Sequence, residues 1–429
     1  MKRVLIVTPH WPPLVYPDMH RARMALPYLA ESGWQALVLS VNPAAQGGVE
    51  EPALVQTIPP ETRQWQAGAI PRAWTTVLGI GHGGWRSLIS LYRLGCKIIE
   101  KEKPELLFFS TTLFPAMILG PLWGKKYGVP YVLDYQDPWV FKRPSEPLSL
   151  GSVKTLLSRA LDQRIEPYVL RKVAHIISVS PSYVKALSDR YPALRPENFT
   201  VLPFGAPEND FIYIQDKQVP QHVYAPQDGK RHWVYSGRGG RDLSLALRAL
   251  FIALAEARRQ TPAAWNNLRL HFIGTQYLPS QDAPKAIERL AGEYGVGDLV
   301  EEKTERIGYL ESLRCLLDAE ALIVPGSEDP GYTASKIYPC ILARKPLLAI
   351  FHERSSVCDV LRKTGAGELV TFSNGESAEA IAARISKGWF DRWPVPTPPT
   401  DWNAFSEYSA REMTRRMCQA FDRTVVSRR

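Results

Sequence analysis

The sequence predicts an α/β protein of two doubly wound domains, each with a parallel sheet covered by helices, that face a cleft. Short apolar runs, typical of strands buried on both faces, alternate with longer helical stretches. A polar, Pro- and Gln-rich stretch at 206–230 interrupts this alternation, which then restarts. The length of 429 residues allows two domains of ordinary size.

The first half alternates strand-like and helix-like segments. Strands are expected at Arg3–Thr8, Gln35–Ser40, Leu106–Ser110, Tyr131–Tyr135 and His175–Ser180. Helices are expected at Arg21–Gly33, Phe114–Gly128 and Thr155–Val173. We therefore assign residues 1–205 to an N-terminal Rossmann-like domain, closed by the run Thr200–Gly205.

The second half repeats the pattern. Its strands are expected at His232–Gly237, Leu268–Gly274, Ala321–Gly326 and Pro346–Phe351. These define a C-terminal Rossmann-like domain over residues 206–400, ending in a Pro-rich linker. Residues 401–429 are predicted to form a helical tail that packs back on the N-terminal domain.

The charge, the cysteines and the apolar runs of the sequence exclude several classes of protein. The net charge of +9 favours anionic ligands or surfaces, but the basic residues are dispersed and no nucleic-acid-binding motif is present, so we expect no nucleic-acid partner. Five scattered cysteines without a CxxC pair argue for a reducing compartment and against a zinc site or disulfide framework. The N-terminus reads as a strand rather than a signal peptide, and no apolar run is long enough to span a bilayer. A cytoplasmic protein is expected, with peripheral attachment to the inner face of the membrane as an option.

The strongest local signal is "SGRGGRD" (236–242), at the end of a predicted strand. Glycines let a backbone approach a ligand closely, and a helix start offers free N–H groups to an anion. Asp242 is expected to cap the helix that follows. The candidate phosphate-binding residues are Gly237, Arg238, Gly239, Gly240 and Arg241. The alternative is a Gly-rich turn with exposed arginines.

A second loop of the same kind, "SEDPGYTASKIYP" (327–339), also follows a strand. Thr333 and Ser335 are candidate helix caps, and Lys336 would stand at the helix start. A lysine there opposes the helix dipole, so an anionic ligand would explain it, whereas a solvated lysine is the alternative. Together the two loops predict a diphosphate site in the second domain.

The chain resembles the GT-B glycosyltransferases of family 4. The resemblance rests on the two-domain plan, "EPYVLRKVAHIISVSPSYVKAL" (Glu166–Leu187), the hinge "VLPFGAPENDF" and "IGYLESLRCLLDAEALIVPG". It implies the GT-B fold and transfer of a sugar from a nucleotide-diphosphate donor, without a bound metal or other cofactor.

The resemblance also implies roles for particular residues. Arg238, with Arg241 or Lys336, matches the pair that holds the donor diphosphate, and Glu328 matches the first glutamate of the family's E-x-F-G-type loop. Pro339 stands where related sequences carry a ribose-binding glutamate, so that contact is expected to be missing. The residues of the second loop that are expected to bind the donor are Glu328, Gly331, Tyr332, Thr333, Ser335 and Lys336.

The first domain is expected to hold the acceptor. The loop after its first strand lies where doubly wound folds bind ligands, and it offers His10, His20 and Arg21 as acceptor contacts. Lone histidines are more often structural. Asp137, after the strand Tyr131–Tyr135, is the candidate catalytic base; alternatively, Asp137 and the proline after it only begin a turn.

These features predict a hexosyltransferase-type enzyme acting on a glycan or lipid-linked acceptor, in cell-surface polysaccharide biosynthesis. The segment 73–96 mixes aromatic and basic residues and is a candidate membrane contact, unless its helix simply packs on its own domain. Two alternatives remain. One is a catalytically weakened GT-B protein that binds a glycan or a partner, and the other is a nucleotide-sugar epimerase.

Overall fold

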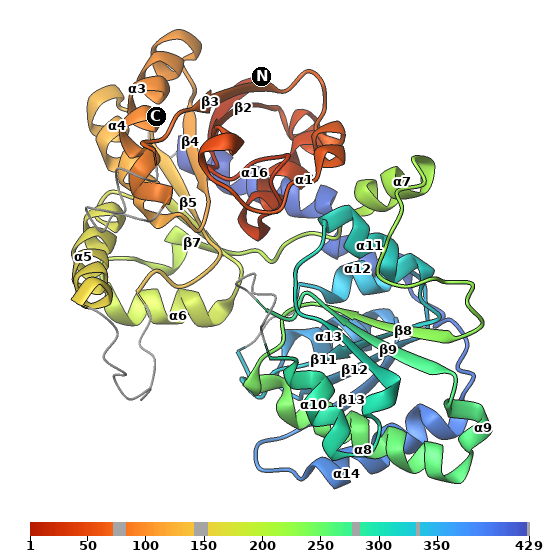
Figure 1. Cartoon of the computed structure of the whole chain (residues 1–429). Helices are drawn as coiled ribbons and strands as arrows, with labels where there is room; N and C mark the ends of the chain where they lie inside the picture. Colours follow the sequence, from red (N-terminus) through yellow and green to blue (C-terminus); the bar gives the residue numbers. More distant parts are fainter. Residues whose placement is uncertain (72–82, 141–152, 277–283, 332–334, 427–429) are drawn as a thin grey trace. The chain divides into compact units, whose positions relative to one another are not determined.

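The computed structural model describes residues 1–71, 83–140, 153–276, 284–331 and 335–426 (Figure 1). It divides into two compact units, Met1–Gly205 together with Ala410–Arg429, and Ala206–Ser409. Each unit contains a parallel β-sheet with helices, so the doubly wound α/β fold predicted for both halves is confirmed.

The sheet of the N-terminal unit has the strand order β3-β2-β1-β4-β5-β6-β7, and all its neighbours pair in parallel. Its strands are β1 (Lys2–Val7), β2 (Trp34–Val41), β3 (Arg63–Ala67), β4 (Leu106–Ser110), β5 (Tyr131–Tyr135), β6 (His175–Ser178) and β7 (Phe199–Val201). The edge strand β3 is absent from the sequence-based prediction because its sequence, RQWQA, is polar and buries only its last residue fully.

Helices cover both faces of this sheet, as adjacent phenylalanines of β4 illustrate. Phe109 packs on Trp123, whereas the preceding residue, Phe108, packs on Phe421 of the C-terminal helix. Successive side chains of a strand point to opposite faces, which is why the run is apolar throughout. The helices are α1 (His20–Leu29), α3 (Gly83–Glu102), α4 (Leu119–Tyr127), α5 (Val153–Leu170), α6 (Pro181–Arg190) and α16 (Ala410–Val426).

The C-terminal unit has a sheet of order β10-β9-β8-β11-β12-β13, again parallel. Its strands are β8 (Arg231–Ser236), β9 (Leu268–Ile273), β10 (Val300–Lys303), β11 (Ala321–Pro325), β12 (Leu347–His352) and β13 (Glu368–Phe372). Its helices are α7 (Glu208–Asp216), α8 (Ser244–Gln260), α9 (Pro262–Trp265), α10 (Ala286–Glu293), α11 (Tyr309–Asp318), α12 (Ile337–Leu342), α13 (Ser356–Thr364), α14 (Ala378–Gly388) and α15 (Trp402–Phe405).

The strand order locates the ligand-binding edge of each unit. In the N-terminal unit the chain adds strands on one side of β1 and then, from β4 on, on the other side. In the C-terminal unit the same change of side occurs between β8 and β11. At such a point the loops after the two central strands diverge, and doubly wound folds bind ligands in the crevice between them. Among the described residues, no helix is long and apolar enough to cross a lipid bilayer.

Candidate functional site

The two loops singled out in the second half of the sequence lie side by side in the C-terminal unit. They follow β8 and β11, which are hydrogen-bonded neighbours. The N–H of Glu328 in one loop donates to the carbonyl oxygen of Asp242 in the other, at 2.8 Å. The sequence placed both loops at strand ends, and the sheet order now joins them into one site.

Gly237 lets a lysine side chain lie directly against the first loop. A Cβ atom on Gly237 would stand 2.2 Å from the Nζ atom of Lys336 and 2.6 Å from the hydroxyl of Tyr235. The same ammonium lies 5.6 Å from the centre of the Tyr235 ring, a cation–π distance. Glycine is therefore required here to make room for a charged group.

The pKa of Lys336 is far below that of an ordinary lysine. Burial foremost, and then the positive charges of Arg238 and Arg306, lower the pKa of Lys336 to about 7. In the described part of the chain, no carboxylate forms an ion pair with this lysine. Positive side chains crowded beside a glycine loop are typical of a phosphate-binding site. Arg306, in the loop after β10, is a member that the sequence reading missed.

Arg238 is held in place by a carboxylate. Its NH1 and NH2 atoms donate to the two carboxylate oxygens of Asp242 at 2.8 and 2.6 Å, and this contact lowers the pKa of Asp242. The expectation that Asp242 caps the following helix is wrong, because α8 begins at Ser244 after an N-cap, Leu243, without a side-chain cap. Asp242 orients Arg238 instead. Arg241 is exposed and lies on the short 3-10 turn before α8.

Glu328 contacts the start of α8. Its Oε1 atom accepts from the hydroxyl of Ser244 and from the N–H of Leu245, each at 3.4 Å. The N–H of Leu245 is a donor that the first helical turn leaves unpaired, so Glu328 supplies the cap that was expected from Asp242. Gly331 lies in a turn in which its N–H donates to the side chain of Asp329 at 2.9 Å.

The helix after the second loop, α12, begins at Ile337 with Lys336 as its N-cap residue and no side-chain cap. The prediction of Ser335 as the cap is therefore wrong, and Lys336 does stand at the helix start. Tyr332 and Thr333 lie outside the described residues. Pro339 is the third residue of α12, where its missing N–H would be unpaired in any case.

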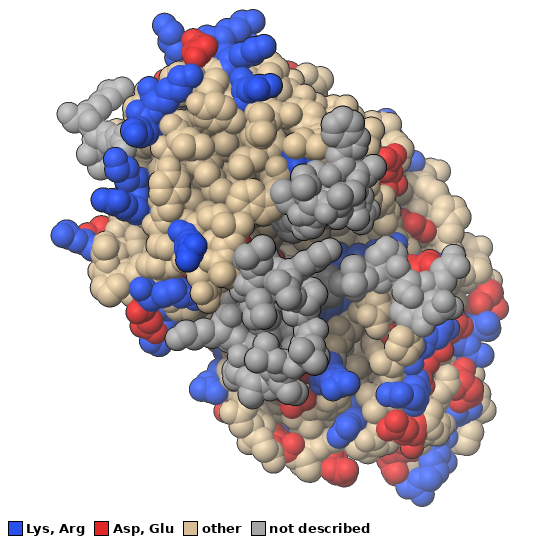
Figure 2. All heavy atoms as spheres, turned by 60° about the vertical axis from the view of Figure 1, so that its left-hand side comes forward, with Lys and Arg blue, Asp and Glu red and all other residues tan. Residues whose placement is uncertain are grey.

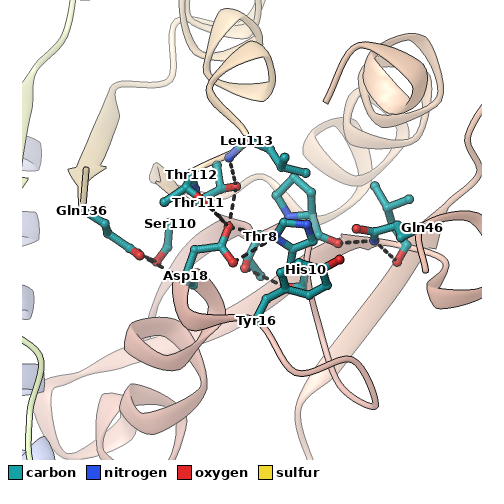
Figure 3. A network of polar contacts seen from close by, with 12 residues as sticks. Thr8, His10, Tyr16, Asp18, Gln46, Ser110, Thr111, Thr112, Leu113 and Gln136 are labelled. Carbon is teal, nitrogen blue, oxygen red and sulfur yellow. Dashed lines mark hydrogen bonds and ion pairs between the residues drawn. The ribbon is translucent and has the colours of Figure 1, made fainter. Parts of the chain in front are cut away.

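The N-terminal unit has its own polar cluster at the point where β1 and β4 diverge (Figure 3). Its centre is Asp18, a buried residue of the 3-10 turn Pro17–Met19. Asp18 accepts from the Nδ1 atom of His10, with 2.9 and 3.0 Å to its two oxygens, and from Thr111 and Thr112 after β4. The sequence indicated His10 but not its carboxylate partner.

Arg21 is fully buried beneath this cluster. Its Nε atom donates to both oxygens of Asp134 at 2.9 and 2.8 Å, and its NH2 atom donates to the carbonyl oxygen of Leu202 at 2.6 Å. Burial raises the pKa of Asp134, although Arg21 acts in the opposite direction. Arg21 thus joins α1 to the sheet and has no surface open to an acceptor.

The remaining predicted residues lie at the same edge. Asp137 reaches the surface just after β5, yet the burial of its carboxyl and then the negative charge of Asp18 raise its pKa to about 6. His20, the first residue of α1, is half-buried and accepts from Arg23 at 3.2 Å. In the described ranges, no three His, Cys, Asp or Glu side chains gather in a way that could hold a metal ion.

Comparisons with known proteins agree with this architecture. Residues 20–205 match the family described as glycosyl transferase 4-like domain. Sucrose-phosphate synthase from Thermosynechococcus elongatus is similar over 100% of both chains, at 15% identity and a TM-score of 0.60. HepE from Anabaena, solved with UDP and with UDP-glucose, covers 98% of this chain and 100% of its own, at 14% identity and a TM-score of 0.59. A search by sequence of the curated proteins finds no match. At these identities the solved structures establish the GT-B fold.

Proposed function

We propose that this chain, whose residues 20–205 match the glycosyl transferase 4-like domain family, is a glycosyltransferase that uses a nucleotide-diphosphate sugar. The observation that carries the proposal is the group of three cations, Arg238, Arg306 and Lys336, around a glycine loop at the ligand-binding edge of the C-terminal unit. Sugar transfer leaves a nucleoside diphosphate, on which negative charge develops as the bond to the sugar breaks. Positive groups fixed in advance at that position stabilise the transition state.

The residues of this edge take separate parts in donor binding. Lys336 and Arg238 contact the diphosphate, and the glycines 237, 239 and 240 let it approach the backbone. Arg241, Gly331, Tyr332, Thr333, Ser335 and Glu328 complete the donor side. HepE, which shares the fold, was solved with UDP, so UDP is the first nucleotide to test. The chemistry needs no metal, because the protein supplies the positive charge.

The N-terminal unit is the proposed acceptor side. Asp137, His10 and His20 lie at the carboxyl edge of its sheet, where an acceptor hydroxyl would meet them. We propose a glycan or lipid-linked acceptor, in cell-surface polysaccharide biosynthesis.

A surface on α3 and α4 supports the lipid-linked class. Along α3 the side chains of Ile89, Arg93 and Lys97 are exposed at helical spacing, with Ile89 56% exposed. Leu122 of α4 is also exposed, beside two lysines of the same helix. Figure 2 shows basic side chains along the rim of an uncharged area of this unit. Exposed apolar side chains with lysines and arginines on the same helices suit an anionic membrane surface.

Part of the segment 73–96 has a different role. Arg86 is buried, and its guanidinium donates to the carbonyl oxygens of Ile70 and Ala45. Residues 73–82 lie outside the described residues. The membrane proposal therefore rests on the exposed side chains of α3 and α4. It predicts that Arg93→Glu with Lys97→Glu abolishes co-sedimentation with phosphatidylglycerol vesicles, whereas Arg248→Glu with Lys387→Glu, the same change in charge on the other unit, does not.

One observation favours a binding protein without turnover. Pro339 replaces the glutamate that, in the family resemblance, grips the ribose. A chain of this kind would bind a nucleotide weakly and release no sugar from it.

The experiment that tests the proposal is calorimetric titration with UDP, GDP and ADP, followed by turnover of their sugar conjugates. We expect one nucleotide to bind and Arg238→Ala to weaken it about 10- to 100-fold, the range for a charge-assisted contact. Arg248→Ala, an exposed arginine of α8, is the matched control and should bind as the wild type does. Binding of none of the three nucleotides would refute the proposal. Binding without turnover would favour the binding protein.

A further inference from the structure

Two buried histidines on neighbouring strands of the C-terminal sheet, β8 and β9, contact each other through their ring nitrogens (Figure 1). The Nδ1 atom of His232 lies 2.9 Å from the Nε2 atom of His271, and the two residues are 4% and 2% exposed. A third ring covers the pair, because Tyr224 stacks on His232 and on His271 with centroid distances of 4.6 and 4.7 Å. Tyr224 belongs to residues 217–230, the connection between α7 and β8, which we call the strap.

A carboxylate lies at each end of this pair. The Nε2 atom of His232 is 3.0 Å from the Oδ1 atom of Asp228 in the strap. The Nδ1 atom of His271 is 3.4 Å from the Oε2 atom of Glu301, which lies opposite it in the register of β9 and β10. The four side chains therefore form a row with three contacts: carboxylate to imidazole, imidazole to imidazole, and imidazole to carboxylate.

Each of these three contacts is stable only when one proton lies in it. Asp228 is an anion, because hydrogen bonds, foremost from the N–H of Lys230, lower its pKa to about 2. Two ring nitrogens without a proton repel each other, and so do such a nitrogen and a carboxylate. Two neutral imidazoles carry only two N–H groups between them, so one of the three contacts would lack its donor. One further proton gives every contact a donor and an acceptor.

A second additional proton does not fit. It would place two N–H groups against each other between ring nitrogens that are 2.9 Å apart. Burial foremost, and then the charge of His232, lower the pKa of His271 to about 4, whereas Asp228 acts in the opposite direction. The nearby cations Lys230, 3.4 Å from Asp228, and Arg269 on β9 lower this pKa further. The pair therefore holds one additional proton and not two.

The helix α11, which packs on the strap, leaves this balance of charge unchanged. The hydroxyl of Tyr224 donates to the carbonyl oxygen of Cys315 on α11 at 2.6 Å. Burial foremost raises the pKa of Tyr224 and that of Cys315, so both side chains stay neutral. The charged side chains of α11 form ion pairs outside the row, Glu311 with His222 at 3.3 Å and Arg314 with Asp318 at 2.8 Å.

We propose that the His232–His271 pair is a proton-binding site that fastens the strap to the sheet of the C-terminal unit. The additional proton lies between the two rings, and Asp228 and Glu301 balance its charge. When this proton leaves, one contact of the row loses its donor, so the strap is held less tightly through Asp228 and Tyr224. The proton site is separate from the proposed donor site, because His232 lies near the start of β8 and the glycine loop follows its end.

This proton makes stability depend on pH in both directions. In an unfolded chain a histidine has a pKa of about 6.5. The first additional proton is bound more tightly in the folded chain, so its contribution to stability is present below a pH of about 6.5 and is lost as the pH rises beyond it. The second is bound more weakly, because the pKa of His271 is about 4, so stability also falls as the pH drops from about 6.5 toward 4. The contribution of the pair is therefore greatest at a pH of about 6.5.

Nitrogen-15 NMR of the full chain, labelled at its eight histidines, counts these protons directly. At a pH of about 6.5 we expect three ring N–H protons in the pair, and a scalar coupling across the N–H···N contact between His232 and His271. His232→Gln and His271→Gln assign the signals. Two ring N–H protons in the wild-type pair at this pH would overturn the proposal, and this measurement needs no variant to fold.

Hydrogen exchange measures how tightly the strap is held. Opening of the strap should release one proton, so exchange of residues 221–228, corrected for its intrinsic pH dependence, should rise by up to about tenfold per pH unit above a pH of about 6.5. Asp228→Asn keeps an acceptor oxygen but removes the charge, so this rise should become smaller. Asp298→Asn is the matched control, because it removes a carboxylate that pairs with Arg258 on the same unit, and the rise should stay as in the wild type.

The results separate a proton site from a histidine pair that only packs. A pair that only packs would lose stability in His232→Gln, but exchange of the strap would not depend on pH before or after the substitution, which overturns the proposal. A rise that persists when both histidines are replaced by glutamine assigns the proton to another group and overturns it as well. Nucleotide binding, which calorimetric titration measures at the donor loops, is a separate result and tests only the proposed function.

Discussion

The substitution Gly237→Ala tests the geometry of the proposed donor site most directly. The new Cβ atom would stand 2.2 Å from the Nζ atom of Lys336. Carbon needs roughly 3.5 Å to a neighbouring heavy atom, so the ammonium must move by more than about 1 Å. Gly237 is not in the left-handed backbone region, so alanine adds a clash without backbone strain.

The expected loss of affinity follows from that displacement. Moving the ammonium by this amount breaks a charge-assisted hydrogen bond to a phosphate oxygen, which is worth about 1.5–3 kcal/mol. The dissociation constant for the nucleotide should therefore rise about 10- to 150-fold. The nearby Tyr235 hydroxyl, 2.6 Å from the new atom, must also shift, so we expect a modest fall in melting temperature as well.

Calorimetric titration, at a temperature where the variant is folded, measures the affinity. Gly292→Ala is the matched control, because Gly292 lies in α10 with nothing within 4 Å of its would-be Cβ. It should bind normally and gain up to about 1 kcal/mol of stability. Lys336→Met should lose as much affinity as Gly237→Ala, and the double variant should lose no more. Normal affinity in Gly237→Ala would refute the reasoning, since the ammonium would then not contact the ligand from this position.

Further predictions concern charge and burial. Because the pKa of Lys336 is about 7, nucleotide binding should take up a proton, and the affinity should fall as the pH rises from 7 to 9. Calorimetric titrations in buffers of different ionisation enthalpy measure the proton uptake. In Lys336→Met the affinity should no longer depend on pH in this range. The raised pKa of Asp137, about 6, means that its contribution to stability is present below its unfolded pKa and is lost as the pH rises through 6. Asp137→Asn should therefore raise the melting temperature at pH 7 and leave it unchanged near pH 3.5, and an equal change at both pH values would contradict this. Arg21→Met leaves the buried carboxylate of Asp134 without its partner and should cost about 3–5 kcal/mol in denaturant unfolding, whereas a cost below about 1 kcal/mol would show that the pair is dispensable. Addition of EDTA should change neither nucleotide affinity nor turnover, and a loss restored by a divalent cation would contradict the metal-free chemistry.

Local sequence was sufficient for the inner strands of both sheets and for the two loops of the proposed donor site. A strand buried on both faces must be apolar along its whole length, and a glycine loop after it is visible within a few residues. The positions of Arg238 just after a strand and of Lys336 at a helix start therefore follow from the chain alone. The edge strands β3, β10 and β13 were not predicted, because their sequences, RQWQA, VEEK and ELVTF, are only partly buried and lack a continuous apolar run.

What each polar side chain contacts was decided by tertiary structure. Asp242 looked like a helix cap, but the competing partner Arg238 takes its carboxylate, and Glu328 from a distant loop caps the helix instead. Arg21 had the position of an acceptor contact, but Asp134 lies beneath it in the sheet. Such pairings join segments far apart in the chain, so no local pattern reports them.

The sequence by itself determined the doubly wound architecture and which strand ends carry charge, because the burial of strands and the turn preferences of glycine act over short stretches. Only the tertiary structure brought Arg306 to Lys336 and the loop after β4 to His10 and Asp18. The order in which strands pair sets these neighbours, and that order is fixed by packing across the whole sheet. The sequence alone shows which loops carry charged residues, whereas the crowding of Arg238, Arg306 and Lys336 arises from the fold.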